Sequence, residues 1–153
     1  TRIILDSDLD IPLEANVIKQ ESEAATIIVT TNHDEQSKKE ELISRGVKIL
    51  ELGTTKKIDL KALLKELAHE EITSLLVEGG SEINSSFWEA ELVDKIYYFI
   101  AHKIIGGTES VPVVGGSGVK EVKNGIKIID KEIKQVGEDL LIVGYPEYKN
   151  SNQ

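Results

Sequence analysis

The fold is decided by residues 74–84, Ser-Leu-Leu-Val-Glu-Gly-Gly-Ser-Glu-Ile-Asn. The apolar first half of this stretch predicts a short buried strand over residues 73–77. After the two glycines the apolar period becomes helical, with Ile83, Phe87 and Ala90 on one side. A strand that passes through a glycine turn into a helix is typical of α/β proteins, which bind ligands at the carboxyl ends of their strands. The turn is therefore also the first candidate site.

Short apolar runs alternate with amphipathic stretches on both sides of this turn. Before it, the pattern predicts strands over residues 2–5, 26–31 and 47–52, a helix over 34–45 with Leu42 and Ile43 inside and Gly46 as cap, and a helix over 59–69. After it, the pattern predicts a strand over 94–101 and an antiparallel hairpin of residues 126–135 and 139–143. We expect an α/β fold with a mixed, mostly parallel sheet that ends in an antiparallel C-terminal hairpin.

Length and composition indicate a single domain over residues 1–148, followed by a disordered tail over 149–153. The net charge is −9, which argues against nucleic acid as a partner. The chain contains no cysteine, which excludes disulfides and thiolate metal sites and fits a cytoplasmic protein. Since no apolar run approaches the ~20 residues that span a bilayer, we expect no membrane partner.

The glycine turn has the chemistry of an anion site. Gly79 and Gly80 allow close approach of a phosphate, and the first N–H groups of the following helix, at its positive end, can receive it. Ser81 adds a hydroxyl, and Glu78 places a carboxylate at the end of the strand. Tight packing alone also explains a Gly-Gly turn. The turn matches neither the dinucleotide fingerprint G-x-G-x-x-G nor the P-loop.

Two longer runs carry a resemblance to a known family. Residues 76–83, Leu-Val-Glu-Gly-Gly-Ser-Glu-Ile, continue through Phe-Trp-Glu-Ala-Glu-Leu-Val-Asp-Lys at 87–95 and Ile-Ile-Gly-Gly at 104–107. This order resembles the C-terminal part of the pyrimidine reductase domain of bifunctional riboflavin biosynthesis proteins, which has a dihydrofolate-reductase-like fold. The opening Arg-Ile-Ile-Leu-Asp-Ser at 2–7 and Gly-Glu-Asp-Leu-Leu at 137–141 resemble further strands of that family, so the resemblance covers nearly the whole chain.

The resemblance implies an NADPH-dependent reduction of 5-amino-6-(5-phosphoribosylamino)uracil to the ribitylamino product. It implies that Glu78 contacts this small-molecule substrate and assigns no catalytic residue and no metal. The residues implied to bind NADPH are Ser7, Gly79, Gly80, Ser81, Glu82, Ile83, Asn84, Ser85 and Ser86. The cofactor carries the hydride, and the protein positions the reactants.

The family pattern also contains parts that this sequence does not match. In the family, several dozen residues precede the strand that begins here and supply substrate-binding groups, and a zinc deaminase domain lies further upstream. We therefore expect the chain to be the C-terminal portion of the reductase domain, lacking the N-terminal strands of the family. A sheet without those strands exposes an edge, which favours a homodimer. Two alternatives stay open: a non-catalytic nucleotide-binding or assembly fragment, and a related enzyme that acts on another pyrimidine or a pterin.

Other polar residues give weaker indications. His33, His69 and His102 lack paired ligand spacing, which favours surface histidines over a metal site. Asp6 with Asp8, Asp10 or Glu78 could form an acid/base couple, but 27 acidic residues make such neighbours frequent by chance.

The sequence leaves two further features open. Lys56 and Lys57 are candidates for the 2′-phosphate of NADPH by charge alone. The glycine-rich loop over residues 106–118 is either a flap or a mobile connection.

Overall fold

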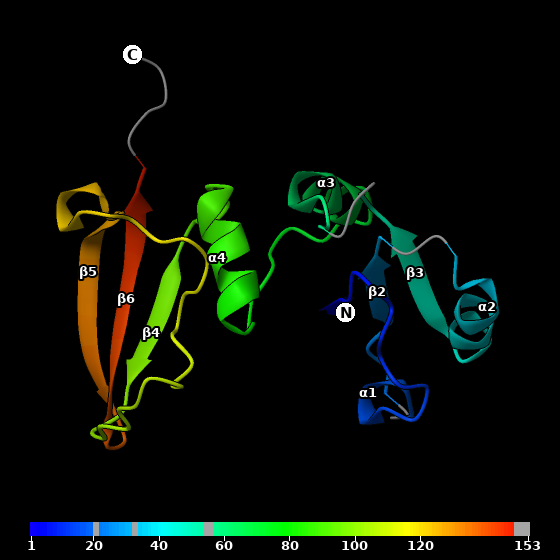
Figure 1. The fold of residues 1–153 in the computed structure, drawn as a ribbon, viewed down its shortest axis with the longest axis horizontal. Helices are drawn as coiled ribbons and strands as arrows, with labels where there is room; N and C mark the ends of the chain where they lie inside the picture. Colours follow the sequence, from blue (N-terminus) through cyan, green and yellow to red (C-terminus); the bar gives the residue numbers. More distant parts are fainter. Residues whose placement is uncertain (20–21, 32–33, 54–56, 149–153) are drawn as a thin grey trace, which may run out of the picture. The chain divides into compact units, whose positions relative to one another are not determined.

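The computed structural model describes residues 1–19, 22–31, 34–53 and 57–148 (Figure 1). The chain comprises two compact units, Thr1–Leu75 and Leu76–Gln153. The first unit holds a parallel sheet and the second an antiparallel sheet, each of three strands. The predicted α/β class, with parallel first strands and an antiparallel C-terminal hairpin, is confirmed.

The sheet of the first unit has the order β1-β2-β3, with β1 at Arg2–Leu5, β2 at Thr26–Thr30 and β3 at Val47–Glu51. All three strands are parallel. The central strand β2 is buried at every position. A strand covered on both faces must be apolar or β-branched throughout, and the sequence Thr-Ile-Ile-Val-Thr meets that requirement.

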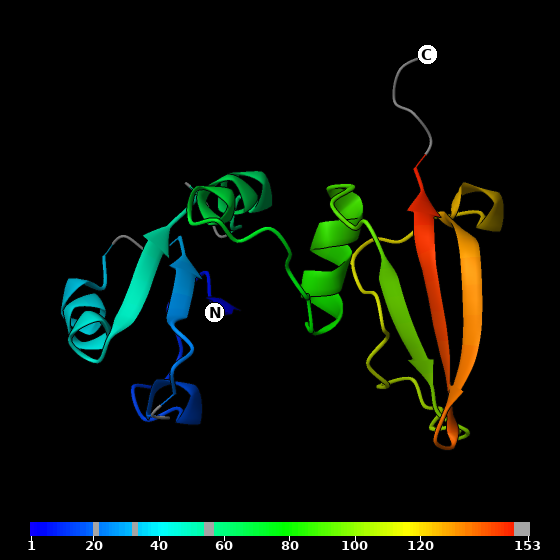
Figure 2. The same ribbon diagram turned by 180° about the vertical axis from the view of Figure 1, so that it is seen from behind.

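Helices cover both faces of this sheet (Figures 1 and 2). On one face, Ile28 packs with Ile18 of α1 (Asn16–Lys19) and Leu42 of α2 (Gln36–Ser44). On the other face, Ile27 and Val29 pack with Leu63 and Leu67 of α3 (Leu60–His69). Successive residues of a strand point to opposite faces, so β2 supplies both cores. The short helix α1 was not expected from the sequence.

The boundaries of α2 and α3 follow local capping chemistry. Asp59 precedes α3, and its side chain accepts a hydrogen bond of 2.9 Å from the N–H of Ala62. Gly46 follows α2 with φ of +82°, a left-handed conformation that glycine adopts readily, as predicted for the cap. One expectation for α2 was wrong: Ile43 is 55% exposed. The helix buries only a narrow stripe, Lys39 and Leu42, which are three positions apart on one side.

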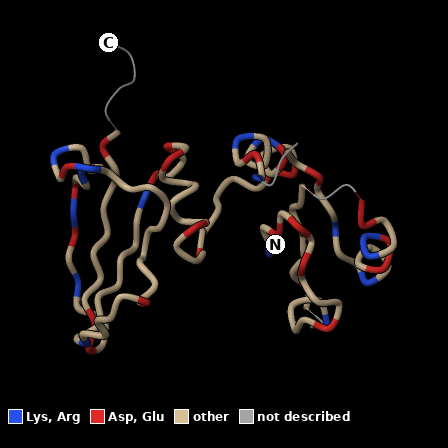
Figure 3. Tube along the Cα trace, viewed as in Figure 1, with Lys and Arg blue, Asp and Glu red and all other residues tan. Residues whose placement is uncertain are grey.

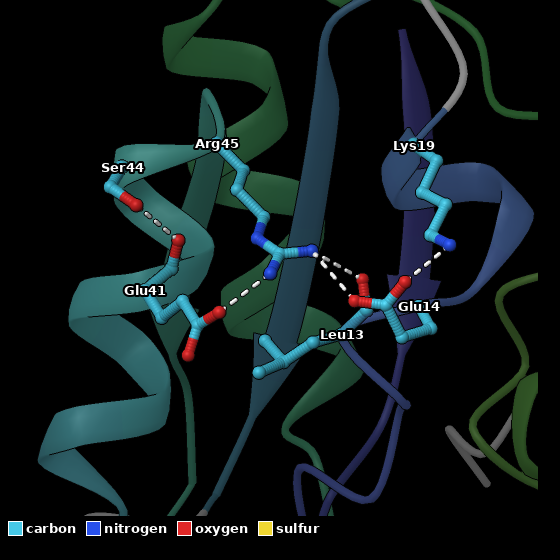
Figure 4. Close-up of polar contacts among 6 residues, drawn as sticks. All are labelled: Leu13, Glu14, Lys19, Glu41, Ser44 and Arg45. Atoms are coloured by element: carbon cyan, nitrogen blue, oxygen red, sulfur yellow. Dashed lines mark hydrogen bonds and ion pairs between the residues drawn. The ribbon is translucent and has the colours of Figure 1, made fainter.

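A polar network ties the segment before α1 to the end of α2 (Figure 4). Arg45 donates to the carbonyl of Leu13 at 2.7 Å and to the carboxylate of Glu41 at 2.6 Å. Glu14 pairs with Lys19 and lies 3.7 Å from Arg45. These cations, Lys19 first, lower the pKa of the Glu14 carboxyl below its usual value. Arg45 therefore holds the connection after β1 against α2.

The second unit contains α4 (Ser81–Glu89), a 3₁₀ turn at Val122–Asn124, and a sheet of order β4-β6-β5. Its strands are β4 at Ile96–Ile100, β5 at Lys127–Val136 and β6 at Asp139–Glu147. The predicted hairpin of β5 and β6 is present, and because Val136 pairs with Asp139 its turn has two residues. The edge strand β5 is interrupted by a bulge between Ile129 and Glu132 and carries alternating positive and negative residues (Figure 3). Bulges and charges of this kind keep an edge strand from pairing further.

The predicted strand over residues 73–77 does not form. A strand needs a neighbour that completes its backbone hydrogen bonds, and none of the described strands pairs with this segment. Ile72 and Leu75 instead contribute side chains to the cluster around Leu63 and Leu67, whereas Leu76 is 72% exposed. The strands therefore form two separate sheets.

Within the described residues, no helix is long and apolar enough to span a membrane.

Candidate functional site

The glycine turn leads directly into the start of α4. Gly80 is the residue before the helix, with φ of −68° and ψ of 174°, and no side chain caps the helix. The N–H of Asn84 makes the first helical hydrogen bond, 3.1 Å to the carbonyl of Gly80. The N–H groups of Ser81, Glu82 and Ile83 precede that bond and so have no partner within the helix. Together with the helix dipole, they give this end of α4 a partial positive charge.

The two glycines of the turn have different roles. A Cβ added at Gly79 would lie 2.8 Å from both Cβ and Cγ2 of Ile83, so the side chain of Ile83 excludes any larger residue there. A Cβ added at Gly80 would meet nothing within 4 Å. Close packing accounts for Gly79, whereas the space beside Gly80 is open. Tight packing therefore explains Gly79, whereas the anion-site interpretation of Gly80 stays a prediction.

The polar side chains on α4 are largely engaged within the unit. The hydroxyls of Ser85 and Ser86 each donate to the carbonyl of Glu82 at 2.9 Å. The amide nitrogen of Asn84 donates to the carbonyl of Val113 at 2.8 Å and to that of Gly79 at 3.3 Å. Three of the side chains implied to bind the cofactor, those of Asn84, Ser85 and Ser86, thus already donate hydrogen bonds to protein carbonyls.

The end of the glycine-rich loop lies against the same helix. The N–H of Gly115 donates to the carbonyl of Ser81 at 2.9 Å. Gly116, with φ of +73°, packs so closely on α4 that an added Cβ would lie 2.9 Å from Cβ of Ser85 and 2.6 Å from Oε1 of Glu89. This contact was not expected from the sequence. Its available signal was the small pair Ser81 and Ser85, one helical turn apart, together with adjacent glycines.

Carboxylates surround the turn. Glu78 is exposed just before the glycines, and Glu82 lies in the first turn of α4. An added Cβ at Gly115 would lie 3.1 Å from Oε1 of Glu82, so this carboxylate is directed toward the loop. A carboxylate in the first turn is favoured by the helix dipole. It also competes with any phosphate for the same partial positive charge.

Ser7 belongs to the first unit and follows β1 at the carboxyl end of the parallel sheet. Its carbonyl accepts hydrogen bonds from the hydroxyls of Thr30 at 3.0 Å and Thr31 at 3.1 Å. The preceding Asp6 accepts from the backbone N–H groups of Asp10 at 3.0 Å and Ile11 at 2.8 Å. The oxygens of Asp6 therefore shape the loop, which argues against the acid/base couple.

The remaining candidate residues are dispersed. His69 ends α3 and His102 is exposed after β4, and the described residues contain no cluster of His, Asp and Glu that could hold a metal ion. Trp88 lies 6.5 Å from the ring of Tyr148 and Phe87 is 4% exposed, so both aromatics pack within the unit. His33, Lys56 and the predicted tail over 149–153 lie outside the described residues.

Comparison with known proteins gives consistent matches. Residues 1–142 match the model of the RibD C-terminal domain. The riboflavin biosynthesis protein RibD of Aquifex aeolicus is 40% identical over 141 residues, which cover 92% of this chain and 37% of that protein. A second Aquifex protein, 2,5-diamino-6-ribosylamino-4(3H)-pyrimidinone 5′-phosphate reductase, is 38% identical over 80% of this chain and 54% of its own.

A solved structure shares the fold. The diaminohydroxyphosphoribosylaminopyrimidine deaminase/5-amino-6-(5-phosphoribosylamino)uracil reductase of Thermotoga maritima superposes with a TM-score of 0.71 at 22% identity, over 95% of this chain and 37% of that one. The chain thus spans less than two fifths of the RibD relative and of this structure. The family model covers nearly the whole chain. The glycine turn, α4 and the antiparallel hairpin follow one another in the order expected from the family resemblance. The chain belongs to the RibD C-terminal domain family.

Proposed function

We propose that this chain is part of an enzyme that reduces 5-amino-6-(5-phosphoribosylamino)uracil to its ribitylamino product with NADPH. The names of the related proteins support a pyrimidine reductase of riboflavin biosynthesis. They do not name the cofactor. NADPH, when bound, supplies the hydride, and the contribution of the chain is to bind and orient the two reactants.

The observation that carries the proposal is the uncapped start of α4 after Gly80. Three N–H groups lack partners within the helix, and the space beside Gly80 is open. A phosphate group fits such a helix start, because its oxygens accept hydrogen bonds and its charge opposes the helix dipole. The residues present are therefore compatible with the pyrophosphate of a dinucleotide. Glu82 in the first turn of α4 opposes a phosphate there, but its carboxylate is directed toward Gly115.

The other site residues receive proposed roles on this basis. Glu78, exposed beside the turn, would contact the pyrimidine substrate, since a carboxylate accepts hydrogen bonds from ring and exocyclic N–H groups. Gly79, Gly80, Ser81, Glu82 and Ile83 would approach the cofactor through their backbone. Ser7, at the carboxyl end of β1, is proposed to contact the same cofactor, since ligands bind at this edge of parallel sheets.

The proposal extends to partners. The family names support a deaminase domain in the longer relatives, so we propose that such a domain accompanies the reductase in the full protein.

A homodimer is also proposed. It is supported by β4, an edge strand of the antiparallel sheet whose Tyr97 and Phe99 are 55% and 58% exposed. A cytoplasmic location agrees with the absence of cysteine from the sequence.

Titration with NADPH and NADH, followed by cofactor fluorescence, tests the proposal. The chain should bind NADPH saturably, and Gly80→Glu should weaken binding more than Gly80→Gln, because only the charged side chain repels the pyrophosphate. Asn124→Glu adds the same charge at an exposed position outside the turn and α4 and controls for net charge. Equal losses in the two Gly80 variants would show that size, not charge, matters there.

The same NADPH titration should also be made with a protein that is extended at its N-terminus. Binding only by a longer, N-terminally extended protein would keep the family function and make this chain a fragment. If neither protein binds NADPH up to millimolar concentration, the reductase proposal is wrong.

A further inference from the structure

The loop segment 113–116, here called the latch, meets α4 at several points along one side of the helix. Asn84 donates to the carbonyl of Val113 at 2.8 Å, and Gly115 donates to the carbonyl of Ser81 at 2.9 Å. These bonds run in opposite directions, one from the helix to the latch and one from the latch to the helix. The latch is therefore held by two backbone groups of its own, not by a single contact.

At the two glycines of the latch, the packing on α4 leaves no room for a side chain. An added Cβ at Gly115 would lie 3.2 Å from Cβ of Ser81, and one at Gly116 would lie 2.9 Å from Cβ of Ser85. Such distances are below ordinary contact for carbon atoms, and the backbone of Gly116 also has the left-handed φ of +73°. Glycine at 116 and serine at 85 are thus matched, and larger residues at either position would lift the latch from the helix.

Asn84 connects the latch to the glycine turn. Its amide nitrogen carries two hydrogens and donates hydrogen bonds to the carbonyls of Val113 at 2.8 Å and Gly79 at 3.3 Å. The carbonyl of Gly79 belongs to the peptide that leads into Gly80, the residue before the helix. One side chain therefore fixes both the latch and the orientation of the peptide that precedes the open helix start.

We propose that Asn84 is a positioning residue that orders the glycine turn by clamping the latch onto α4. This inference rests on the proposed function, in which the helix start binds the phosphates of NADPH. The amide nitrogen is already committed to two carbonyls, so Asn84 acts on the cofactor through the turn. A turn that is ordered before binding does not lose conformational entropy when the ligand arrives, and preorganisation of this kind raises affinity.

The test compares two variants that break the latch from opposite sides. Asn84→Ala removes the clamp, and Gly116→Ala adds a methyl group at a strained φ against Ser85 and Glu89. Each should weaken NADPH binding about tenfold, and the double variant should be no weaker than either single variant, since both changes release the same element. Asn84→Gln, which keeps the amide donor, should recover most of the affinity. Ser110→Ala is the control: it removes a 2.8 Å hydrogen bond to Gly107 elsewhere in the loop and should leave affinity unchanged.

Amide hydrogen exchange of Gly115 gives a second measurement that does not need the cofactor. Its N–H is bonded to Ser81, so release of the latch should speed its exchange about tenfold in Asn84→Ala and in Gly116→Ala but not in Ser110→Ala. Unchanged exchange in Asn84→Ala would overturn the clamp.

The two measurements separate this inference from the proposed function. If Asn84→Ala weakens NADPH binding but Gly116→Ala does not, or if the two losses add, Asn84 contacts the cofactor directly and the positioning role is wrong. If the unaltered chain binds no NADPH, the proposed function fails, and Gly115 exchange alone decides whether Asn84 holds the latch.

Discussion

The hydroxyl of Tyr148 both donates to the carbonyl of Val93, at 3.0 Å, and accepts from the N–H of the same residue, at 3.1 Å. One side chain after β6 thus satisfies both backbone groups of a residue in the turn between α4 and β4. Its ring also packs at 6.5 Å from Trp88 of α4. Tyr148 therefore joins the end of the described chain to the helix that carries the glycine turn.

Removal of this hydroxyl should destabilise the second unit. Tyr148→Phe keeps the ring but leaves the N–H and carbonyl of Val93 unpaired and partly buried, which costs about 1–3 kcal/mol. Urea unfolding followed by tryptophan fluorescence measures the loss, since Trp88 is the only tryptophan. Tyr98→Phe, the same change on β4, should shift stability by less than about 0.5 kcal/mol. Equal effects of the two changes would contradict the role of Tyr148.

Alkaline pH should weaken the same contact. Burial raises the pKa of the Tyr148 phenol above its usual value of 10.0. The unfolded chain then loses this proton at a lower pH than the folded chain. The contribution of Tyr148 is thus complete below pH 10 and is lost as the pH rises through the higher folded-state pKa. Unfolding free energies measured between pH 8 and about 11 should fall less steeply in Tyr148→Phe than in the unaltered chain.

The ion pair of Lys39 and Glu51 should respond asymmetrically to substitution. The two groups are 2.8 Å apart, and the Lys39 side chain is 4% exposed whereas that of Glu51 is 36% exposed. Glu51→Gln leaves a buried ammonium without its counter-charge and should cost about 3 kcal/mol. Lys39→Met leaves a carboxylate that water can reach and should cost less than about 1 kcal/mol. Urea unfolding of both variants checks the order, and a larger loss in Lys39→Met would contradict it.

The N-terminal cap of α3 should contribute to folding stability independently of the core. Asp59 accepts from the N–H of Ala62 at 2.9 Å, so Asp59→Ala leaves a helix-start N–H unpaired and should cost about 1 kcal/mol. Asp59→Ser retains an oxygen acceptor and should restore most of that stability. Thermal unfolding monitored by circular dichroism compares the three proteins. Equal melting temperatures for the alanine and serine variants would show that the cap contributes nothing.

The two glycines of the turn should tolerate alanine differently. Gly79→Ala forces a methyl group to within 2.8 Å of Ile83 and should cost about 1–3 kcal/mol through displacement of the turn. Gly80→Ala meets no atom within 4 Å, and its φ of −68° suits any residue, so its effect should stay within about 0.5 kcal/mol. Urea unfolding of the two alanine variants measures the stability that each loses. Similar losses would mean that the space beside Gly80 is not open in solution.

Prediction from the sequence succeeded where structure depends on near neighbours. The strands β1 to β3, the stripe of α3, the Gly46 cap and the hairpin of β5 and β6 all follow from apolar period and turn residues within short windows. Prediction failed at Ile43 and at residues 73–77. In both cases the deciding factor was a partner elsewhere in the chain: the packing of α2 in the first case and a pairing strand in the second.

The sequence by itself determined the α/β class, the family and the position of the glycine turn, because periodicity and an ordered motif are properties of consecutive residues. Only the tertiary structure decided the use of individual side chains. Asn84 and Val113 are 29 positions apart, and Tyr148 and Val93 are 55 positions apart. Folding brings such pairs within hydrogen-bond distance, and no local pattern encodes which distant carbonyl a donor will reach.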